Sequence, residues 1–190
     1  AGNLCGRVKG VRVKSIADPL MNDDLRAWVR SIGIARAETD PEIILDDREI
    51  DAVFICSPTD THADLIVRSA GAGKHIFCEK PVGSDPAIIR KAVDAARAAG
   101  IKLQVGFVRR FDHNHGAVAE AIRSGRIGRV ELIKVTSRDP APPPIGYVKR
   151  SGGLFFDMMI HDFDMARFLA GSEVTEVYAR GAALIDARIE

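Results

Sequence analysis

The chain has 190 residues, of which 46% are hydrophobic and 28% are charged, and its formal net charge is +1. These values are ordinary for a globular protein with a real core, in one domain or two small ones. With so little net charge and no basic run, nucleic acid is a poor partner. The apolar stretches are too short to span a bilayer and the N-terminus lacks a signal-peptide pattern, so we expect no membrane partner either.

Strands and helices alternate in the first part of the chain. We expect strands at residues 11–17, 52–56, 75–78 and 103–105, and we expect the continuous apolar run at 52–56 to be buried on both faces. We expect helices at 23–31, 41–46, 61–70 and 86–99, the last starting near Pro86 and stopping at Gly100. This alternation predicts βαβ units and a parallel sheet.

The pattern changes after Gly106. A helix at 114–123, a strand at 130–137, a helix around 157–164 and strand material at 174–188 are expected, with a proline-rich stretch at 140–144. We therefore predict one domain at 1–107 and another at 108–190. The prolines could form a mere linker, but a rigid loop next to the chemistry is the preferred interpretation.

Three cysteines, Cys5, Cys56 and Cys78, form neither a disulfide framework nor a metal-ligand spacing. Two of them fall at strand ends, where a free thiol packs as a small apolar group in a reducing compartment. These observations predict a cytoplasmic protein.

A lysine, a carboxylate and a histidine stand out as candidate catalytic groups. Asp157 and His161 are four residues apart, so on one helix they share a face, and the neighbouring stripes are apolar. A polar stripe there would be half buried, where an unpaired charge is costly; a solvated surface pair is the alternative. Lys80 follows an expected strand, and Pro81 holds it in an extended conformation.

Three blocks carry a resemblance to a known family. They are Phe77-Cys78-Glu79-Lys80-Pro81, Val105 to Asp112, and Ser151-Gly152-Gly153 running into Asp157 and Ile160 to Asp164. In this order and at this spacing they resemble the glucose-fructose oxidoreductase/inositol dehydrogenase (Gfo/Idh/MocA) family, over nearly the whole chain. The resemblance implies an NAD-dependent enzyme that oxidises a cyclic polyol, myo-inositol being the best match, and a homo-oligomer. The alternatives are another sugar substrate of the same family, or a non-catalytic fragment or binding module.

The fold class expected is α/β: a Rossmann-type doubly wound sheet, followed by part of an α+β domain with a mixed or antiparallel sheet. The G-x-G-x-x-G turn of such domains follows no strand here, and Gly71-Ala72-Gly73 reads as a helix end. Residues 1–4 resemble the tail of the helix after that turn, so we interpret the chain as a fragment. The first strand would lie between those ending at Asp18 and Cys56, and without it two sheet edges are exposed. We expect this polypeptide alone to be unstable and inactive.

Cofactor contacts are expected at the carboxyl ends of the strands. Asp18 is placed to bind the adenosine ribose, and no arginine follows closely, which favours NAD over NADP; a turn-forming aspartate is the alternative. The resemblance places a second set of residues beside the nicotinamide, although a plain strand-to-helix turn would explain the first four equally: Ser57, Pro58, Thr59, His62, Glu79 and Lys80.

The expected mechanism assigns a role to each catalytic group. His161 accepts the hydroxyl proton, Lys80 stabilises the alkoxide, and Asp157 orients the imidazole and favours its protonated form. Arg109, Asp139 and Tyr147 are candidate polyol contacts together with His161. The loop residues Asp112, His113 and His115 do not make a convincing metal site, and no metal is expected. The resemblance also implies a cis bond between Lys80 and Pro81.

Overall fold

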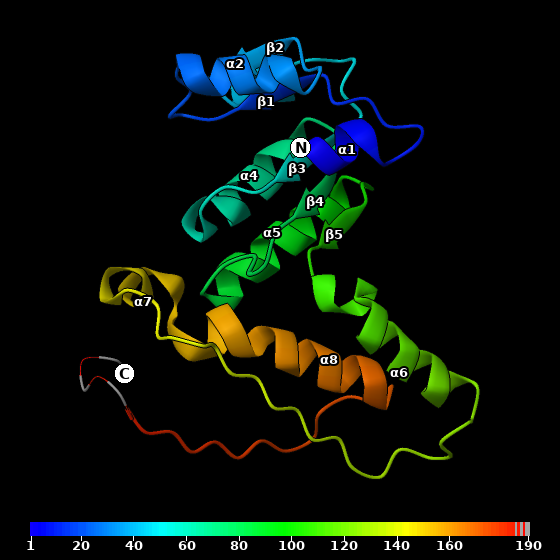
Figure 1. Ribbon diagram of the computed structural model, residues 1–190. Coiled ribbons are helices and arrows are strands. Elements are labelled where there is room, and N and C mark those ends of the chain that lie inside the picture. The colour runs from blue at the N-terminus through cyan, green and yellow to red at the C-terminus, as the bar shows by residue number, and fades with distance from the viewer. Residues whose placement is uncertain (185, 187, 189–190) are drawn as a thin grey trace. The chain divides into compact units, whose positions relative to one another are not determined.

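The computed structural model describes residues 1–184, 186 and 188 (Figure 1). Two compact units can be distinguished. The first unit comprises Ala1–Ile55, Asp64–Phe77 and Lys91–Leu103, and the second comprises Cys56–Ala63, Cys78–Arg90 and Gln104–Glu190.

The first ten elements alternate helices with strands. They are α1 (Gly2–Gly6), β1 (Ser15–Ala17), α2 (Asp23–Ser31), β2 (Arg36–Glu38), α3 (Glu42–Leu45), β3 (Ala52–Ile55), α4 (Thr59–Gly71), β4 (His75–Cys78), α5 (Pro86–Ala98) and β5 (Leu103–Val105). Every strand and helix expected before residue 107 is present. Strand β2 was not expected, because its ends are the charged residues Arg36 and Glu38 and it has no apolar run.

The strands form two separate sheets. Strands β1 and β2 pair in parallel, with Ser15 opposite Arg36, and the other sheet has the order β3-β4-β5. The amide of Ile76 bonds to the carbonyl of Lys102, and two residues further along β4 the carbonyl of Cys78 accepts from the amide of Gly106. Residue numbers thus rise in the same direction along both segments, as they do in parallel strands. No strand pairing joins the two sheets among the described residues, but parallel pairing and the alternation of strands with helices are features of an α/β fold. The α/β fold class is therefore confirmed.

Strand β3 is not buried on both faces, so that prediction was wrong. Val53 and Ile55 are buried, whereas Phe54 is 50% exposed and stacks on Phe77 with ring centroids 5.2 Å apart. A continuous apolar run shows that both faces could be buried, but burial needs a covering layer on each. The described part of the chain supplies one on a single face.

The first unit is held by a small apolar core and a charged cluster. Val29 of α2, Ile34 after it and Ile66 of α4 are almost completely buried. Asp47 receives hydrogen bonds from Lys14, before β1, at 2.8 Å and from Arg36 of β2 at 2.7 Å. The bond from Lys14 leads the causes that lower the pKa of Asp47 to about 2. These contacts tie the β1-β2 pair to the segment after α3.

The second unit contains five further elements, most of them helical. They are the 3₁₀ turn η1 (Val108–Phe111), α6 (His113–Arg123), α7 (Ile145–Ser151), the π-helical turn η2 (Phe155–Met159) and α8 (Ile160–Ala170). Helix α8 lies against η1 and α6, with Met165 of α8 and Ala121 of α6 buried (Figure 1). Helix α7 was not expected, because its segment follows the prolines and has little apolar periodicity.

The mixed or antiparallel sheet expected in the second half is absent from the described residues. Residues 130–139 and 173–183 have no regular secondary structure, and residues 185 and 187 of the expected strand at 174–188 lie outside the description. Strand hydrogen bonds require a neighbouring strand, and neither segment pairs with the other. Their apolar side chains stay exposed, as Leu132 (82%) and Val177 (79%) illustrate. No described helix is long and apolar enough to cross a membrane.

Candidate active site

Lys80 contacts Asp157, although 77 residues separate them in the sequence. Lys80 follows β4, and the Lys80–Pro81 bond is cis, as the resemblance implied. Its Nζ donates hydrogen bonds to the backbone carbonyl of Asp157 at 2.6 Å and to Oδ1 of the same residue at 3.2 Å. The two side chains are 20% and 26% exposed, so the pair is partly shielded from water. The structure thus brings together two of the three expected catalytic groups.

Tyr147 joins this pair from helix α7. Its hydroxyl donates to Oδ1 of Asp157 at 2.9 Å, the oxygen that also accepts from Lys80. This hydrogen bond is the first cause of a raised Tyr147 pKa, followed by burial and by the charge of Asp157. Tyr147 was expected to contact the polyol; in the structure its hydroxyl donates to the carboxylate, and its oxygen can still accept a hydrogen bond.

The expected pairing of Asp157 with His161 is not observed. Asp157 lies in η2 and His161 in α8, and Nδ1 of His161 is buried with no hydrogen-bond partner in the described part of the chain. The four-residue spacing places two side chains together only in a regular α-helix. The wider π-helical turn at Asp157 changes that register, and the carboxylate faces Lys80 and Tyr147 instead.

The pKa of His161 is lowered from 6.5, contrary to the expectation that Asp157 would favour the protonated form. Burial is the largest cause, followed by the positive charges of Lys80 and Arg109, while Asp162 and Asp164 act in the opposite direction. His161 is consequently neutral at pH 7, the state in which an imidazole can accept a proton.

Arg109, another expected substrate residue, is paired within the protein. Its guanidinium contacts the carboxylate of Asp162, which also accepts a hydrogen bond from the Ser137 hydroxyl at 2.6 Å. This cluster ties the irregular segment at 130–139 to α8, one residue after His161. Sequence reasoning gave Asp162 no role, because its partner lies 53 residues away and no local spacing reports the pairing.

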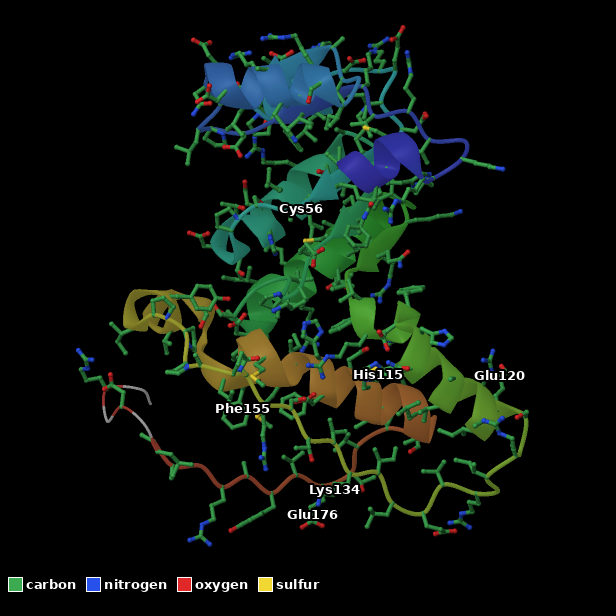
Figure 2. All side chains as sticks on the ribbon, viewed as in Figure 1. Cys56, His115, Glu120, Lys134, Phe155 and Glu176 are labelled. Atoms are coloured by element: carbon green, nitrogen blue, oxygen red, sulfur yellow. The ribbon has the colours of Figure 1, made fainter. Side chains whose placement is uncertain are left out.

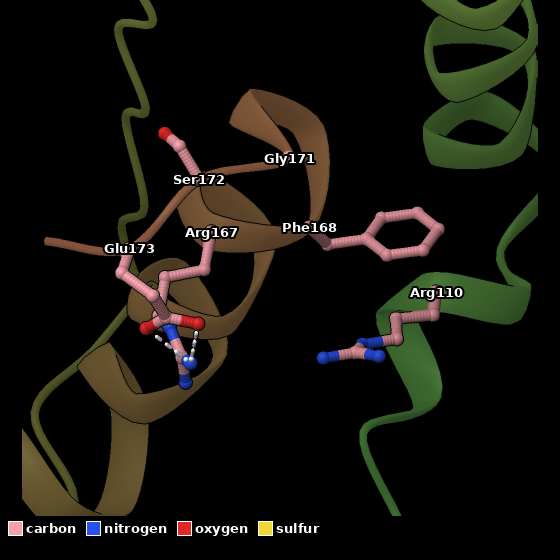
Figure 3. Close-up of a pocket in the computed structure, with 6 residues that line it drawn as sticks. All are labelled: Arg110, Arg167, Phe168, Gly171, Ser172 and Glu173. Atoms are coloured by element: carbon pink, nitrogen blue, oxygen red, sulfur yellow. Dashed lines mark hydrogen bonds and ion pairs between the residues drawn. The ribbon is translucent and has the colours of Figure 1, made fainter.

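Arg110 and Asp164 form a second pair between η1 and α8. Nε of Arg110 donates to Oδ2 of Asp164 at 2.8 Å, Nη2 contacts Oδ1, and the Asp164 side chain is only 6% exposed. The guanidinium also lies over the rings of Phe107 and Phe168. Figure 3 shows Arg110 and Phe168 next to each other on one side of a hollow whose other side carries the Arg167–Glu173 ion pair.

The loop after β3 is held by its own hydrogen bonds. The hydroxyls of Ser57 and Thr61 are 2.6 Å apart, and Thr61 also donates to the carbonyl of Pro58. His62 is 1% exposed, and its two ring nitrogens lie 2.7 Å from the carbonyl oxygens of Pro81 and Ser57. No ring nitrogen of His62 is left for the cofactor contact that we expected.

The remaining residues expected to bind cofactor or substrate lie at the ends of strands and helices or in irregular segments. Thr59 begins α4, Glu79 directly follows β4, and Asp139 is exposed in the irregular segment. In the first unit, Asp18 follows β1 and its Oδ1 accepts from the amide of Leu20 at 2.8 Å. This is the turn-forming role considered as the alternative, and it leaves the second carboxylate oxygen for another donor.

The polar residues before α6 have a structural role. Asp112 caps the helix by accepting from the amides of Asn114 and His115, and it also contacts the ring of His115. His115 lies near the start of α6 (Figure 2). The described residues contain no group of three or more histidine, cysteine or acidic side chains arranged to hold a metal ion.

The residues at the carboxyl ends of the strands have a chemistry that fits a nicotinamide cofactor. Polar loops follow β3 and β4 at their carboxyl ends, where parallel α/β sheets bind ligands. In the first unit, Asp18 follows β1, the strand end at which such folds place an acid for the ribose. Parallel strands with polar loops at their carboxyl ends, and an acid after β1, are features that nicotinamide-binding folds share.

Comparison with known proteins identifies the family. Residues 3–107 match the model of the oxidoreductase family with an NAD-binding Rossmann fold, and residues 115–190 match the GFO/IDH/MocA C-terminal domain. The chain belongs to the GFO/IDH/MocA oxidoreductase family.

Individual relatives include inositol dehydrogenases. An inositol 2-dehydrogenase of Rhizobium meliloti is 58% identical over 74% of this chain and 43% of its own length. A structure of a myo-inositol dehydrogenase from Corynebacterium glutamicum covers 100% of this chain and 56% of its own, with 35% identity and a TM-score of 0.91. A scyllo-inositol dehydrogenase from Lactobacillus casei, solved with NAD(H) and scyllo-inositol, covers 89% and 51%, with 34% identity and a TM-score of 0.78. The chain spans about half the length of the curated relatives it matches.

Proposed function

We propose that the whole protein oxidises a ring secondary alcohol with NAD, most specifically myo-inositol to 2-keto-inositol. The observation that carries the proposal is the convergence of Lys80, Asp157 and Tyr147 close to a neutral, half-buried His161. A neutral imidazole can accept a hydroxyl proton, and an ammonium can stabilise the negative charge that develops on the oxygen. The inositol dehydrogenases among the relatives support the choice of substrate.

Each group has a distinct part in the proposed reaction. His161 accepts the hydroxyl proton, and the Lys80 ammonium donates a hydrogen bond to the oxygen as negative charge develops on it. Asp157 holds that ammonium through its carbonyl and its carboxylate, so that little reorganisation is needed during the reaction. When bound, the nicotinamide would accept the hydride from the carbon that bears the hydroxyl group.

Steady-state oxidation of myo-inositol with NAD by the intact protein tests this proposal. His161→Ala should lower turnover by about 10²–10⁴-fold, the usual effect of losing a positioned proton acceptor. NAD affinity should barely change, because the imidazole acts on the alcohol. His113→Ala is the matched control, since His113 is exposed at the start of α6 and should retain wild-type turnover. Near-normal turnover of His161→Ala would contradict the mechanism.

The same assay separates the alternatives. If the natural substrate were another ring alcohol, such as scyllo-inositol, its kcat/KM would be higher than that of myo-inositol. Its oxidation would still depend on Lys80 and His161. A non-catalytic binding module would show no turnover with any polyol. The proposal also includes three properties of the whole protein. They are a cytoplasmic location, which cell fractionation would test, a homo-oligomeric state (dimer or tetramer), which sedimentation would test, and a domain boundary near residue 107, which limited proteolysis would test.

A further inference from the structure

The carboxylate of Asp162 joins two segments that are far apart in the sequence. Its Oδ1 accepts a hydrogen bond from the Ser137 hydroxyl at 2.6 Å and also contacts Nη1 of Arg109. The same nitrogen of Arg109 donates to the Ser137 oxygen at 3.4 Å, so the three side chains close a ring of contacts, the Asp162 cluster. The side chains of Asp162 and Arg109 are 14% and 27% exposed. The cluster lies within the second unit and connects η1, residues 130–139 and α8.

The Asp162 cluster lies near the proposed proton acceptor. Asp162 directly follows His161 in α8. Burial is the largest cause of the lowered His161 pKa, and among the charges that act on it Arg109 lowers the pKa whereas Asp162 raises it. Both charged groups therefore lie near the imidazole. The cluster fixes a guanidinium close to the place where the alcohol would give up its proton.

The cluster uses one part of the guanidinium and leaves another part available. An arginine side chain has five N–H donors in a fixed planar fork. Both contacts of Arg109 in the cluster use Nη1, and no described residue accepts a hydrogen bond from its Nε or Nη2. Because the fork is rigid, holding Nη1 also limits the directions in which the other donors can point. Such donors suit a molecule that presents several hydroxyl oxygens.

We propose that Asp162 is a positioning residue, whose carboxylate and its Ser137 partner hold the Arg109 guanidinium as a donor to a second hydroxyl of the ring alcohol. The proposal rests on the proposed function, because it takes the reacting hydroxyl to bind at His161. Asp162 acts through Arg109 and does not itself contact the alcohol. A ring that carries further hydroxyls should therefore bind more tightly than a ring with a single hydroxyl.

Steady-state kinetics of the intact protein with myo-inositol and NAD test the positioning role. Asp162→Ala releases the guanidinium and should raise the KM for myo-inositol by about tenfold, the size of one hydrogen bond, with kcat changed by less than about threefold. Asp162→Asn keeps an oxygen that can accept from Ser137 and Arg109, so it should recover part of the loss. Ser137→Ala removes one hydroxyl and leaves the ion pair, and should raise the KM by about threefold. The KM for NAD should stay the same.

A purely structural role for Asp162 would give a different pattern. It would reduce the fraction of folded enzyme, so that kcat would fall and the KM for myo-inositol would not change, and this result would overturn the proposal. If Asp162→Ala did not fold, Ser137→Ala would decide, because an unchanged KM in that variant would also overturn it. Glu173→Ala is the matched control, since Glu173 likewise pairs with an arginine of α8, Arg167, and should leave both constants unchanged.

Analogues of myo-inositol that each lack one hydroxyl identify the second hydroxyl. For one analogue, wild type and Asp162→Ala should have the same KM, because the oxygen that accepts from Arg109 is gone and the two losses are not additive. If Asp162→Ala kept its full effect with every analogue, the proposal would be wrong although the proposed function stood. If the wild type oxidised no ring polyol, the proposed function itself would fall, and this proposal with it.

Discussion

Asp157 is the residue whose role changed most between sequence and structure. The four-residue spacing predicted a partner for His161, whereas the carboxylate binds the ammonium of Lys80 and the hydroxyl of Tyr147. The pattern could not reveal this, because a π-helical turn has no reliable sequence signal and Lys80 is distant in the chain. Lys80 and Asp157 were nevertheless both among the three catalytic groups expected from the sequence and its family resemblance.

Removing the Tyr147 hydroxyl should loosen this cluster. In Tyr147→Phe, the Asp157 carboxylate loses the hydrogen bond that it accepts from the tyrosine hydroxyl. A hydrogen bond to a charged group is worth about 1.5–3 kcal/mol. Because Tyr147 is 46% exposed, we expect a smaller effect, a decrease in kcat of about three- to tenfold. Steady-state kinetics check this, with Tyr178→Phe as a control at a tyrosine that is 87% exposed. A loss confined to the KM for inositol would instead favour direct contact with substrate.

The lowered His161 pKa makes a signed prediction about pH. Since the base must be neutral, the acid limb of kcat/KM should have its midpoint below 6.5. Arg109→Met removes a charge that lowers this pKa and frees the opposing carboxylate of Asp162, so the limb should move to higher pH. Arg109→Lys retains the charge and should move it less. An acid limb above 6.5 in the wild type would be incompatible with this environment.

The same shift affects stability. Between the folded pKa of His161 and 6.5, the unfolded chain binds more protons than the folded one, so this group's contribution to stability rises with pH across that window. Thermal unfolding of wild type and His161→Phe across that range measures the contribution.

Helix α8 depends on pairings with η1 that no helical pattern reveals. Periodicity located α8 and its buried Met165, because apolar burial is a local property of the sequence. The ion pairs of Arg109 and Arg110 with α8 join residues more than 50 positions apart. The segments at 130–137 and 174–188 have a composition typical of strands. A strand also needs a neighbouring strand with which to pair, and the composition of a segment does not show whether one is present.

The Arg110–Asp164 pair should contribute measurably to stability. In Arg110→Met, the carboxylate of Asp164 is left buried without its partner, and we expect unfolding to become easier by about 2 kcal/mol. This value is below that of fully buried pairs because the Arg110 side chain is 40% exposed. Arg110→Lys keeps the charge but loses the two-point contact, and should fall in between. Chemical denaturation of the intact protein measures both.

The result would differ if the Arg110–Asp164 pair contributed nothing to the free energy of unfolding. Arg110→Met would then unfold like the wild type, and the Phe107 and Phe168 rings would account for the packing of this side chain. The double variant Arg110→Met/Asp164→Leu separates the cases, since replacing both partners removes the unpaired charge and should restore part of the loss.

Two described segments without regular structure carry large apolar side chains that are almost fully exposed. Leu132 lies in residues 130–139, and Val177 and Tyr178 lie in residues 173–183, all with most of their surface in contact with water. Unpaired backbone next to exposed apolar side chains favours association through strand pairing. The 190-residue polypeptide should therefore self-associate.

Sedimentation velocity of this polypeptide over a range of concentrations tests that expectation. The variant with Leu132→Lys and Val177→Lys should weaken association by about tenfold or more, since hiding two such side chains is worth more than the 1.4 kcal/mol that a tenfold change represents. Leu20→Lys is the control, because Leu20 is 80% exposed in a turn after β1 and belongs to neither segment, and it should leave association unchanged. If Leu20→Lys weakened association as much as the double variant, added positive charge alone would explain the effect, and the two segments would have no special part in it.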